Sequence, residues 1–422
     1  MKTKENNYSR RSFIKLAGGA ALAGLLQSPA AGMANHRVSK AVSKEVNRML
    51  LNEEDRTRYV LRLLEKLCTD LGPRPTGSAQ YAQGARIIKE EMQRFLPLVE
   101  YDNYLFDQWE PIGEAEFFVG EQYIETYLAA GSPGTPSSGI TGILEQTGTR
   151  FRLIDPLTKE IKALIVKNGY GRAIPVDYKG NGNELNVPQF MIGMQDVPLI
   201  ERAIQNQPNV RLKGQVRFLK DSKGINIVGQ LPGKTRDEIL FVAHADTMYT
   251  SPGAIDNTTS VIVMLMLADA LAGSELKHTL TFLATDAEEY GYLGAKHYAG
   301  KRTANDTMKN IRYVINFDSI AWGPNLWINS LDDEIKTMIQ SVHNDLNLNT
   351  TPIFKHQDGF VMDSESFRPS GAKAMHVNSR GYDEKTLPLY HRPDDDAQRL
   401  PLDCCEIAFQ VFNEYIKRID KL

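Results

Sequence analysis

Short apolar runs alternate with helical patterns along the second half of the chain. From residue 225 onward the runs consist mainly of Val, Ile, Leu, Phe and Ala, and the stretches between them carry apolar residues at helical spacing. This alternation predicts an α/β fold, a three-layer αβα sandwich with a mixed, largely parallel central sheet between two layers of helices. The expected strands are residues 239–243, 279–284, 313–317 and 374–377, and the expected helices are residues 258–272, 293–299, 334–346 and 402–419.

The first half of the chain follows a different pattern. Apolar residues at helical spacing predict helices at 55–69 and 79–95, separated by a segment rich in Gly and Pro. Short β-like runs, a second Gly- and Pro-rich stretch and one expected helix at 196–205 then follow. We predict a main α/β domain and a small β-rich domain inserted into it, with these bounds: residues 35–107 and 220–422 for the main domain, and residues 108–219 for the inserted domain.

The N-terminal segment has the pattern of an export signal. Arg10-Arg11 precede the apolar run 16–26, and small residues follow it. A basic start, a short apolar run and small residues are typical of signal peptides, and the paired arginines resemble the twin-arginine type. The run is too short and too rich in Gly for a membrane span, so no stable membrane anchor is expected. We predict that residues 1–34 are a twin-arginine signal peptide and that the protein is periplasmic or secreted.

The composition is that of a soluble globular protein. Of 422 residues, 42% are hydrophobic and 24% are charged, which excludes a mainly disordered chain or a multi-span membrane protein. Lys and Arg number 49 against 52 Asp and Glu, so the formal charge of -3 points to no nucleic-acid partner. Three cysteines are too few for a disulfide framework or a thiolate zinc site, so His and carboxylates would have to hold any metal. A bond from Cys68 to Cys404 or Cys405 stays open in an exported protein.

Polar residues with metal-binding side chains follow the predicted strands. His244 and Asp246 come directly after the strand that ends at Ala243, and Asp318 follows the strand that ends at Phe317. In open α/β sheets, binding sites collect at the carboxyl ends of strands. Three further pairs complete the set: Asp256 and Asn257 before the expected helix 258–272, Glu288 and Glu289 after the strand 279–284, and Tyr390 and His391 in a loop with Pro393.

This set of side chains suits a pair of divalent metal ions. Two imidazoles with several carboxylates are suitable ligands for Zn²⁺, and also for Mn²⁺ or Co²⁺. Two metals about 3.5–4 Å apart that share one carboxylate can activate a water molecule and polarise a carbonyl together. Of the adjacent Glu288 and Glu289, one carboxylate can bind metal while the other takes the proton of the water. Asp246 is placed to accept a hydrogen bond from the second ring nitrogen of His244 and so to fix that ring.

Taken in order along the chain, these segments resemble those of the M28 zinc aminopeptidases. The family pattern has His-x-Asp, Gly-Ala-x-Asp-Asn, Glu-Glu with a following Gly-x-x-Gly, Asn-x-Asp and Tyr-His-x-Pro, and each of these segments is present here. The inserted domain is placed like the protease-associated domain of larger family members. The resemblance implies a cis peptide bond after the bridging Asp and the following roles: His244 and Asp318 on one zinc, Glu289 and His391 on the other, Asp256 bridging both, Glu288 as general base, and Tyr390 as a donor to the developing oxyanion.

The resemblance therefore predicts an exported zinc-dependent aminopeptidase with two zinc ions per chain. It would hydrolyse N-terminal residues from peptides by a metal-activated water, with Glu288 as general base. A glutaminyl-peptide cyclotransferase of the same fold is an alternative that the retained His244 disfavours, and an inactive binding ectodomain is disfavoured because no ligand is missing. A carboxypeptidase or dipeptidase also stays open, since positive charges for a substrate carboxylate are available at Arg368, Arg380 and Arg392.

Overall fold

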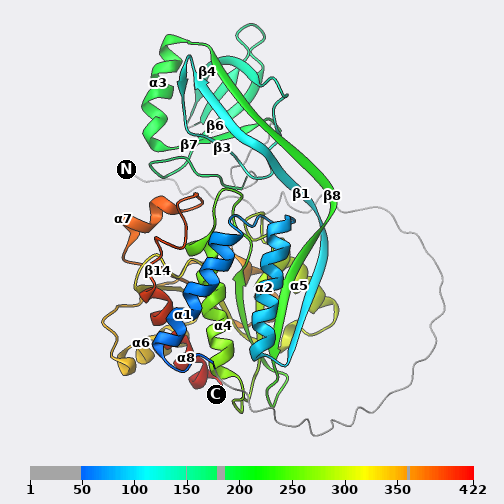
Figure 1. The fold of residues 1–422 in the computed structure, drawn as a ribbon, viewed down its shortest axis with the longest axis vertical. Helices are drawn as coiled ribbons and strands as arrows, with labels where there is room; N and C mark the ends of the chain where they lie inside the picture. Colours follow the sequence, from blue (N-terminus) through cyan, green and yellow to red (C-terminus); the bar gives the residue numbers. More distant parts are fainter. Residues whose placement is uncertain (1–48, 149, 178–185, 359–361) are drawn as a thin grey trace, which may run out of the picture. The chain divides into compact units, whose positions relative to one another are not determined.

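The structure, a computed structural model, describes residues 49–422 except residues 149, 178–185 and 359–361. Residues 45–422 form one compact unit. The expected signal peptide lies outside the described residues, and export stays a prediction. Within the compact unit, a helix-covered sheet is continued by a smaller part that is rich in strands (Figure 1).

A mixed sheet forms the middle layer of the main domain. In order across the sheet, its strands are β13 (Ile353–Lys355), β12 (Asn325–Asn329), β14 (Lys373–Arg380), β11 (Ile311–Phe317), β9 (Glu238–His244), β10 (Thr279–Thr285) and β8 (Val210–Leu231). The central strands β14, β11, β9 and β10 pair in parallel, whereas β12 and β8 pair antiparallel with β14 and β10. The predicted α/β fold with a largely parallel centre is therefore confirmed.

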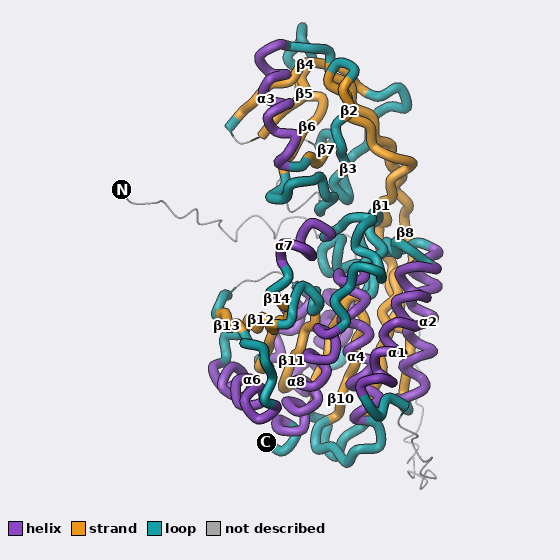
Figure 2. Tube along the Cα trace, turned by 60° about the vertical axis from the view of Figure 1, so that its left-hand side comes forward, coloured by secondary structure: helices purple, strands orange, loops and turns teal. Residues whose placement is uncertain are grey.

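Helices cover both faces of this sheet: Figure 2 labels those of one face, and Figure 1 also labels α5 (Leu293–Ala304) of the other. They are α1 (Glu53–Leu64), α2 (Ala79–Phe95), α4 (Thr259–Leu271), α6 (Asp333–Leu346) and α8 (Asp403–Ile419) on one face, and α5 on the other. Because successive side chains of a strand point to opposite faces, Phe241 of β9 packs in the core with α4 and α8. Its neighbours Leu240 and Val242 pack in a second core with Tyr298 of α5.

Helix α4 is buried along nearly its whole length, and its N-terminal end follows directly on the segment that contains Asp256 and Asn257. Among the described residues, the segment Ala254–Leu271 is the one helical segment long and apolar enough to cross a membrane, judged by length and composition. However, 94% of that segment is buried within the protein, as expected for the core helix of a globular domain. The polar residues at its N-terminal end, Asp256 and Asn257, are buried as well.

The described residues between 108 and 219 pack around a further apolar core, and we use the name inserted domain for this part of the chain. It is joined to the main sheet by two long antiparallel strands, β1 (Leu98–Val119) and β8, whose register shifts between Phe106 and Gln108. The core includes Phe117, Phe151, Phe190 and Ile200, all of which are fully buried. Its other elements are β2 (Gln122–Tyr123), β3 (Tyr127–Leu128), β4 (Ile140–Thr147), β5 (Arg150–Ile154), β6 (Ile161–Lys167), β7 (Gln189–Ile192) and α3 (Val197–Asn206).

The three cysteines are free thiols. Cys68 is buried and its thiol lies 3.4 Å from Thr258 Oγ1, while Cys404 and Cys405 are buried near the start of α8. Burial raises the pKa of Cys405 to about 12, so this thiol stays protonated and unreactive at neutral pH. The pairing that the sequence left open is not formed in this structure.

Arg74 ties the N-terminal helices to the loop that leads into α4. Its buried guanidinium donates four hydrogen bonds of 2.6–3.1 Å, to Leu67 O, Gly72 O, Pro252 O and Thr258 Oγ1. Arg74→Met would leave these buried acceptors unpaired, and we expect it to lower the free energy of unfolding by about 3 kcal/mol in a denaturant titration. Arg86→Met, which removes only an exposed ion pair with Glu90, should leave this free energy almost unchanged. Equal losses in the two variants would contradict the role given to Arg74.

Candidate functional site

The predicted ligand side chains meet at the carboxyl ends of the central strands. His244 is the last residue of β9, Asp318 directly follows β11, and Asp256 lies just before α4. Glu289 follows β10, and His391 lies in the loop that precedes α8. The parallel pairing of β10, β9 and β11 brings these ends to one edge of the sheet, where the strand pattern predicts a site.

The side chains form two buried groups that share Asp256. His244, Asp256 and Asp318 make the first group, and Asp256, Glu289 and His391 make the second. The ligand atoms of each group all lie within 4.8 Å of one another. Oδ1 of Asp256 is 3.1 Å from Nε2 of His244, and Oδ2 of Asp256 is 3.4 Å from Nε2 of His391. The two oxygens of one carboxylate thus face two different histidines, which is the arrangement that a bridging ligand requires.

The donor set fits zinc. Imidazole nitrogens and carboxylate oxygens are ligands that Zn²⁺ prefers. Nε2 of His391 is buried and has no hydrogen-bond partner among the described residues, although it lies 3.1 Å from Glu289 Oε2. A buried ring nitrogen and several buried carboxylates at this spacing are costly without a cation, because their lone pairs and charges face one another. Each group provides at least three ligand atoms, as zinc sites with an open position do.

Glu288 lies beside the first group and is a member of neither. Its Oε2 is 3.9 Å from His244 Nε2, and 14% of its side chain is exposed. Burial raises the pKa of Glu288 well above its ordinary value; the negative charges of Asp318 and Glu289 add to this, and His244 opposes it. A buried carboxyl group with a raised pKa is suited to take up and return a proton.

Asp246 holds the turn that carries the two glutamates. His244 Nδ1 donates to the backbone carbonyl of Asp246 at 3.0 Å, whereas the nearest carboxylate oxygen of Asp246 is 3.6 Å away. The carboxylate accepts instead from the backbone N–H groups of Glu288 and Glu289 at 3.1 and 3.3 Å. Asp246 therefore accepts from the His244 ring as expected, but with its main-chain oxygen, and its side chain positions the neighbouring turn.

Tyr390 belongs to an aromatic wall beside the second group. Its ring stacks on that of His391 with the centroids 3.7 Å apart. It also meets the edge of Trp322 at 5.5 Å and lies 5.8 Å from Tyr170, which comes from the inserted domain. The guanidinium of Arg380 lies over the ring of Trp322, 4.7 Å from the ring centroid. The wall bounds the site with apolar surface and places the Tyr390 side chain next to a ligand.

Asp395, which the sequence pattern did not single out, holds the segment that carries Asp256. Its buried carboxylate accepts from the backbone N–H groups of Ile255 at 2.8 Å and of Asp256 at 3.1 Å. Burial raises the pKa of Asp395 to about 7, and the charge of Asp256 adds to the rise. Three consecutive Asp residues follow Pro393, so the sequence offers no means of choosing the one that turns inward.

Asn257 links the two loops that carry the first group. Its side chain donates to Phe317 O at 3.0 Å and accepts from Ser319 N at 2.9 Å, on either side of Asp318. The peptide bond between Asp256 and Asn257 is cis, as the family resemblance implies. Asp256 and Asp318 are therefore held near each other by the hydrogen bonds of the Asn257 side chain.

Comparison with known proteins gives a family match over the part of the chain that holds the site. Residues 226–416 match the model of Peptidase family M28, and this range contains both ligand groups. Aminopeptidase YwaD of Bacillus subtilis (strain 168) is 22% identical over 377 residues, which cover 82% of this chain and 81% of that protein.

Two solved structures share the fold over most of the chain. BSAP, a zinc aminopeptidase from Bacillus subtilis, superposes with a TM-score of 0.69 at 21% identity, covering 86% of this chain and 95% of BSAP. A Peptidase M28 precursor from Shewanella amazonensis SB2B has a TM-score of 0.70 at 16% identity, covering 86% of this chain and 94% of its own. The shared fold thus extends beyond the range that the family model matches. With that match and the strand-end site on the same residues, residues 226–416 match peptidase family M28, and the chain is a metallo-exopeptidase.

Proposed function

We propose that the protein is an exported aminopeptidase that works with two zinc ions. The observation that carries this proposal is the pair of buried ligand groups that share Asp256, with Glu288 next to them. His244 and Asp318 would hold one zinc ion, Glu289 and His391 the other, and Asp256 both. Export by the twin-arginine route rests on Arg10-Arg11 and the apolar run behind them.

Glu288 and Tyr390 have separate roles in the proposed hydrolysis of a peptide bond. When bound, zinc supplies a Lewis acid that polarises a carbonyl and lowers the pKa of water. Glu288 takes a proton from the attacking water and returns it to the leaving amine, a role for which its raised pKa suits it. The Tyr390 hydroxyl donates to the oxygen of the former carbonyl as negative charge develops there. The aromatic wall of Trp322, Tyr390 and Tyr170 excludes water from one side of the site.

A preference for a free N-terminus follows from the charge of the site. The two groups and Glu288 place four carboxylates around the reacting centre, those of Asp256, Glu288, Glu289 and Asp318. A protonated α-amine beside them is stabilised electrostatically, whereas an acetylated one loses the charge and brings a bulky group into a buried site.

Free and N-acetylated aminoacyl-nitroanilides test this preference. We expect the free substrates to be cleaved at least about 100-fold faster, since the acetylated ones lack the charged amine and bring a bulky group into the buried site. A zinc chelator should abolish the cleavage, and added zinc should restore it. Equal cleavage of free and acetylated substrates would overturn the aminopeptidase assignment.

One observation keeps a dipeptidase as the second candidate. Arg380 lies over Trp322, whose ring contacts Tyr390, so a positive charge stands at the aromatic wall. Arg380 has an ion pair with Asp383 at 3.6 Å, between partly exposed side chains. Arg392 is buried against Glu125, and Arg368 is paired with Asp358 and Glu365. Dipeptides with free and amidated C-termini, added to the same panel, separate the two candidates: a dipeptidase requires the free carboxylate, and an aminopeptidase accepts the amide.

A further inference from the structure

The two ligand groups differ in what holds them in place. The first is supported within the main domain: the His244 ring donates to Asp246 O, and Asp318 Oδ1 accepts from Ser319 Oγ at 3.1 Å. The second is supported in part by the inserted domain, directly at His391 and, at Glu289, through Met248, whose side chain packs in the core of that domain.

His391 is oriented by a carbonyl of the inserted domain. Its Nδ1 lies 2.9 Å from Pro175 O in a buried contact. A carbonyl oxygen only accepts, so Nδ1 carries the proton and the lone pair of the neutral ring is on Nε2. That lone pair is the one near Asp256 and Glu289. The Pro175 carbonyl therefore sets the tautomer that can bind metal, and it fixes the plane of the ring as well.

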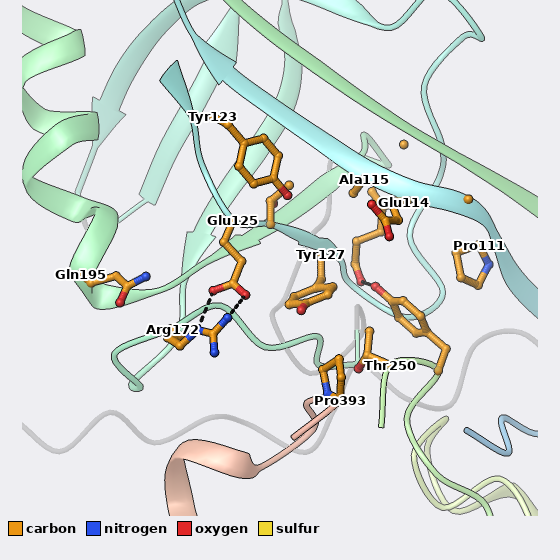
Figure 3. A pocket seen from close by; sticks show the side chains of 15 residues that line it. Pro111, Glu114, Ala115, Tyr123, Glu125, Tyr127, Arg172, Gln195, Thr250 and Pro393 are labelled. Atoms are coloured by element: carbon orange, nitrogen blue, oxygen red, sulfur yellow. Dashed lines mark hydrogen bonds and ion pairs between the residues drawn. The ribbon is translucent and has the colours of Figure 1, made fainter. Parts of the chain in front are cut away.

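Arg392, the residue after His391, binds the segment of the inserted domain that contains Pro175. Arg392 is buried and donates to Ala173 O at 2.6 Å and to Glu125 Oε1 at 2.9 Å. Arg172 makes a second pair with Glu125 (Figure 3). It also makes a longer pair, of 3.3 Å, with Asp394. We call Arg392, Glu125 and the Ala173 carbonyl the Arg392 clamp. Since Ala173 stands two residues before Pro175, the clamp holds the carbonyl that orients His391.

Glu289 is also tied to the inserted domain. Its Oε1 accepts from the backbone N–H of Met248 at 3.1 Å. The Met248 side chain is buried in the core of the inserted domain. The next residue, Tyr249, donates to Leu128 O at 2.8 Å and meets the ring of Trp109 at 5.5 Å, and both partners belong to that domain.

The joint between the two domains is open beside these contacts. A cavity of about 700 Å³ lies there, with Tyr127 and Arg172 of the inserted domain on one side and Thr250 and Pro393 on the other (Figure 3). Contacts beside this cavity hold the inserted domain against the main domain, and the Arg392 clamp is one of them that is buried and charged.

We propose that the inserted domain sets the zinc affinity of the Glu289/His391 position and leaves that of the His244/Asp318 position unchanged. This rests on the proposed function, since it requires that both positions bind zinc. The positioning residues are Arg392 and Glu125, which act through Pro175 O on the His391 ring. Loss of a group that orients a metal ligand typically lowers metal affinity by about 10- to 100-fold.

Zinc titration against a competing chelator tests the proposal on the full chain. We expect Glu125→Gln and Arg392→Lys each to lower the zinc affinity of one position by about 10- to 100-fold. The zinc affinity of the other position should equal that of the unmodified protein. Lys162→Gln removes an ion pair with Asp155 inside the inserted domain and should leave both affinities unchanged. Arg392→Lys keeps the positive charge but loses the planar guanidinium that donates to two acceptors at once. If Arg392→Lys does not fold, the milder Glu125→Gln tests the same contact.

A double variant identifies the position that is affected. His391→Ala removes a ligand of the second group, so Glu125→Gln added to it should change the remaining zinc affinity by less than about twofold. Unchanged affinities in Glu125→Gln would overturn the inference while the proposed function stood. Equal weakening of both ions would also overturn it, because the domain would then act on the whole site. Failure of the unmodified protein to bind two zinc ions would instead remove the proposed function itself.

Discussion

Glu288→Gln is expected to lower kcat by about 10³-fold while both zinc ions stay bound. The amide has the size and shape of the carboxyl group but cannot take a proton, so the variant removes general base catalysis, which is worth about 10²–10⁴-fold. Glu288 belongs to neither ligand group, and its backbone N–H, which donates to Asp246, is unchanged. Steady-state cleavage of a free aminoacyl-nitroanilide gives kcat, and elemental analysis gives zinc per chain.

The zinc content of Glu288→Gln shows whether Glu288 acts as a general base or as a metal ligand. Loss of a zinc ion in Glu288→Gln would show that Glu288 is a ligand and would reassign the proton transfer. Glu289→Gln is the matched comparison, since the two residues are adjacent and only a small part of either side chain is exposed. However, Glu289 lies 3.1 Å from His391, whereas Glu288 lies beside His244. We expect Glu289→Gln to lower zinc affinity and Glu288→Gln to leave it unchanged.

The grouping of the site residues could be predicted because their positions follow a physical rule. His244 and Asp318 stand at the ends of short apolar runs, and such runs become neighbouring parallel strands with their carboxyl ends at one edge. Glu289 follows a third run of the same kind, and α4 begins just after Asp256. The sequence pattern therefore predicts that these residues, which are far apart in the chain, lie close together in the fold.

Other parts of the fold leave little trace in the sequence. The strands β12 and β13 were not expected, because each is short and lies toward one side of the sheet, where side chains need not be uniformly apolar. The long strands β1 and β8 were not expected either, since charged and exposed residues interrupt them as they leave the main sheet. Their pairing with each other explains how both ends of the inserted domain enter and leave side by side.

The groups that support the ligands were the least predictable. Pro175 contributes a backbone oxygen, which no side-chain pattern reports, and it is 216 residues from His391 in the chain. Asp246 uses its main-chain oxygen on the His244 ring and its carboxylate on the turn that carries Glu288. In each case the residue type is compatible with several roles, and only the path of the backbone selects one.

Asp256→Asn should have the largest effect of any single ligand change, because Asp256 alone belongs to both groups. The amide offers one oxygen and one NH₂ where the carboxylate offers two oxygens, and it removes a negative charge from the space between two cations. We expect zinc affinity to fall by more than about 10²-fold at both positions, and activity to fall below about 10⁻³ of the original. Chelator titration and nitroanilide cleavage measure the two effects.

Asp269→Asn is the matched control for this change. Asp269, near the C-terminal end of α4, is buried and accepts from the backbone N–H groups of Met49 and Leu50. Asp269→Asn therefore makes the same chemical change at a buried carboxylate outside the two ligand groups, and should lower stability without lowering zinc affinity. If Asp256→Asn lost only one zinc ion, its carboxylate would serve one position and not two. The short distances from Asp256 to both histidines argue for two, since each of its oxygens lies within 3.4 Å of a different ring.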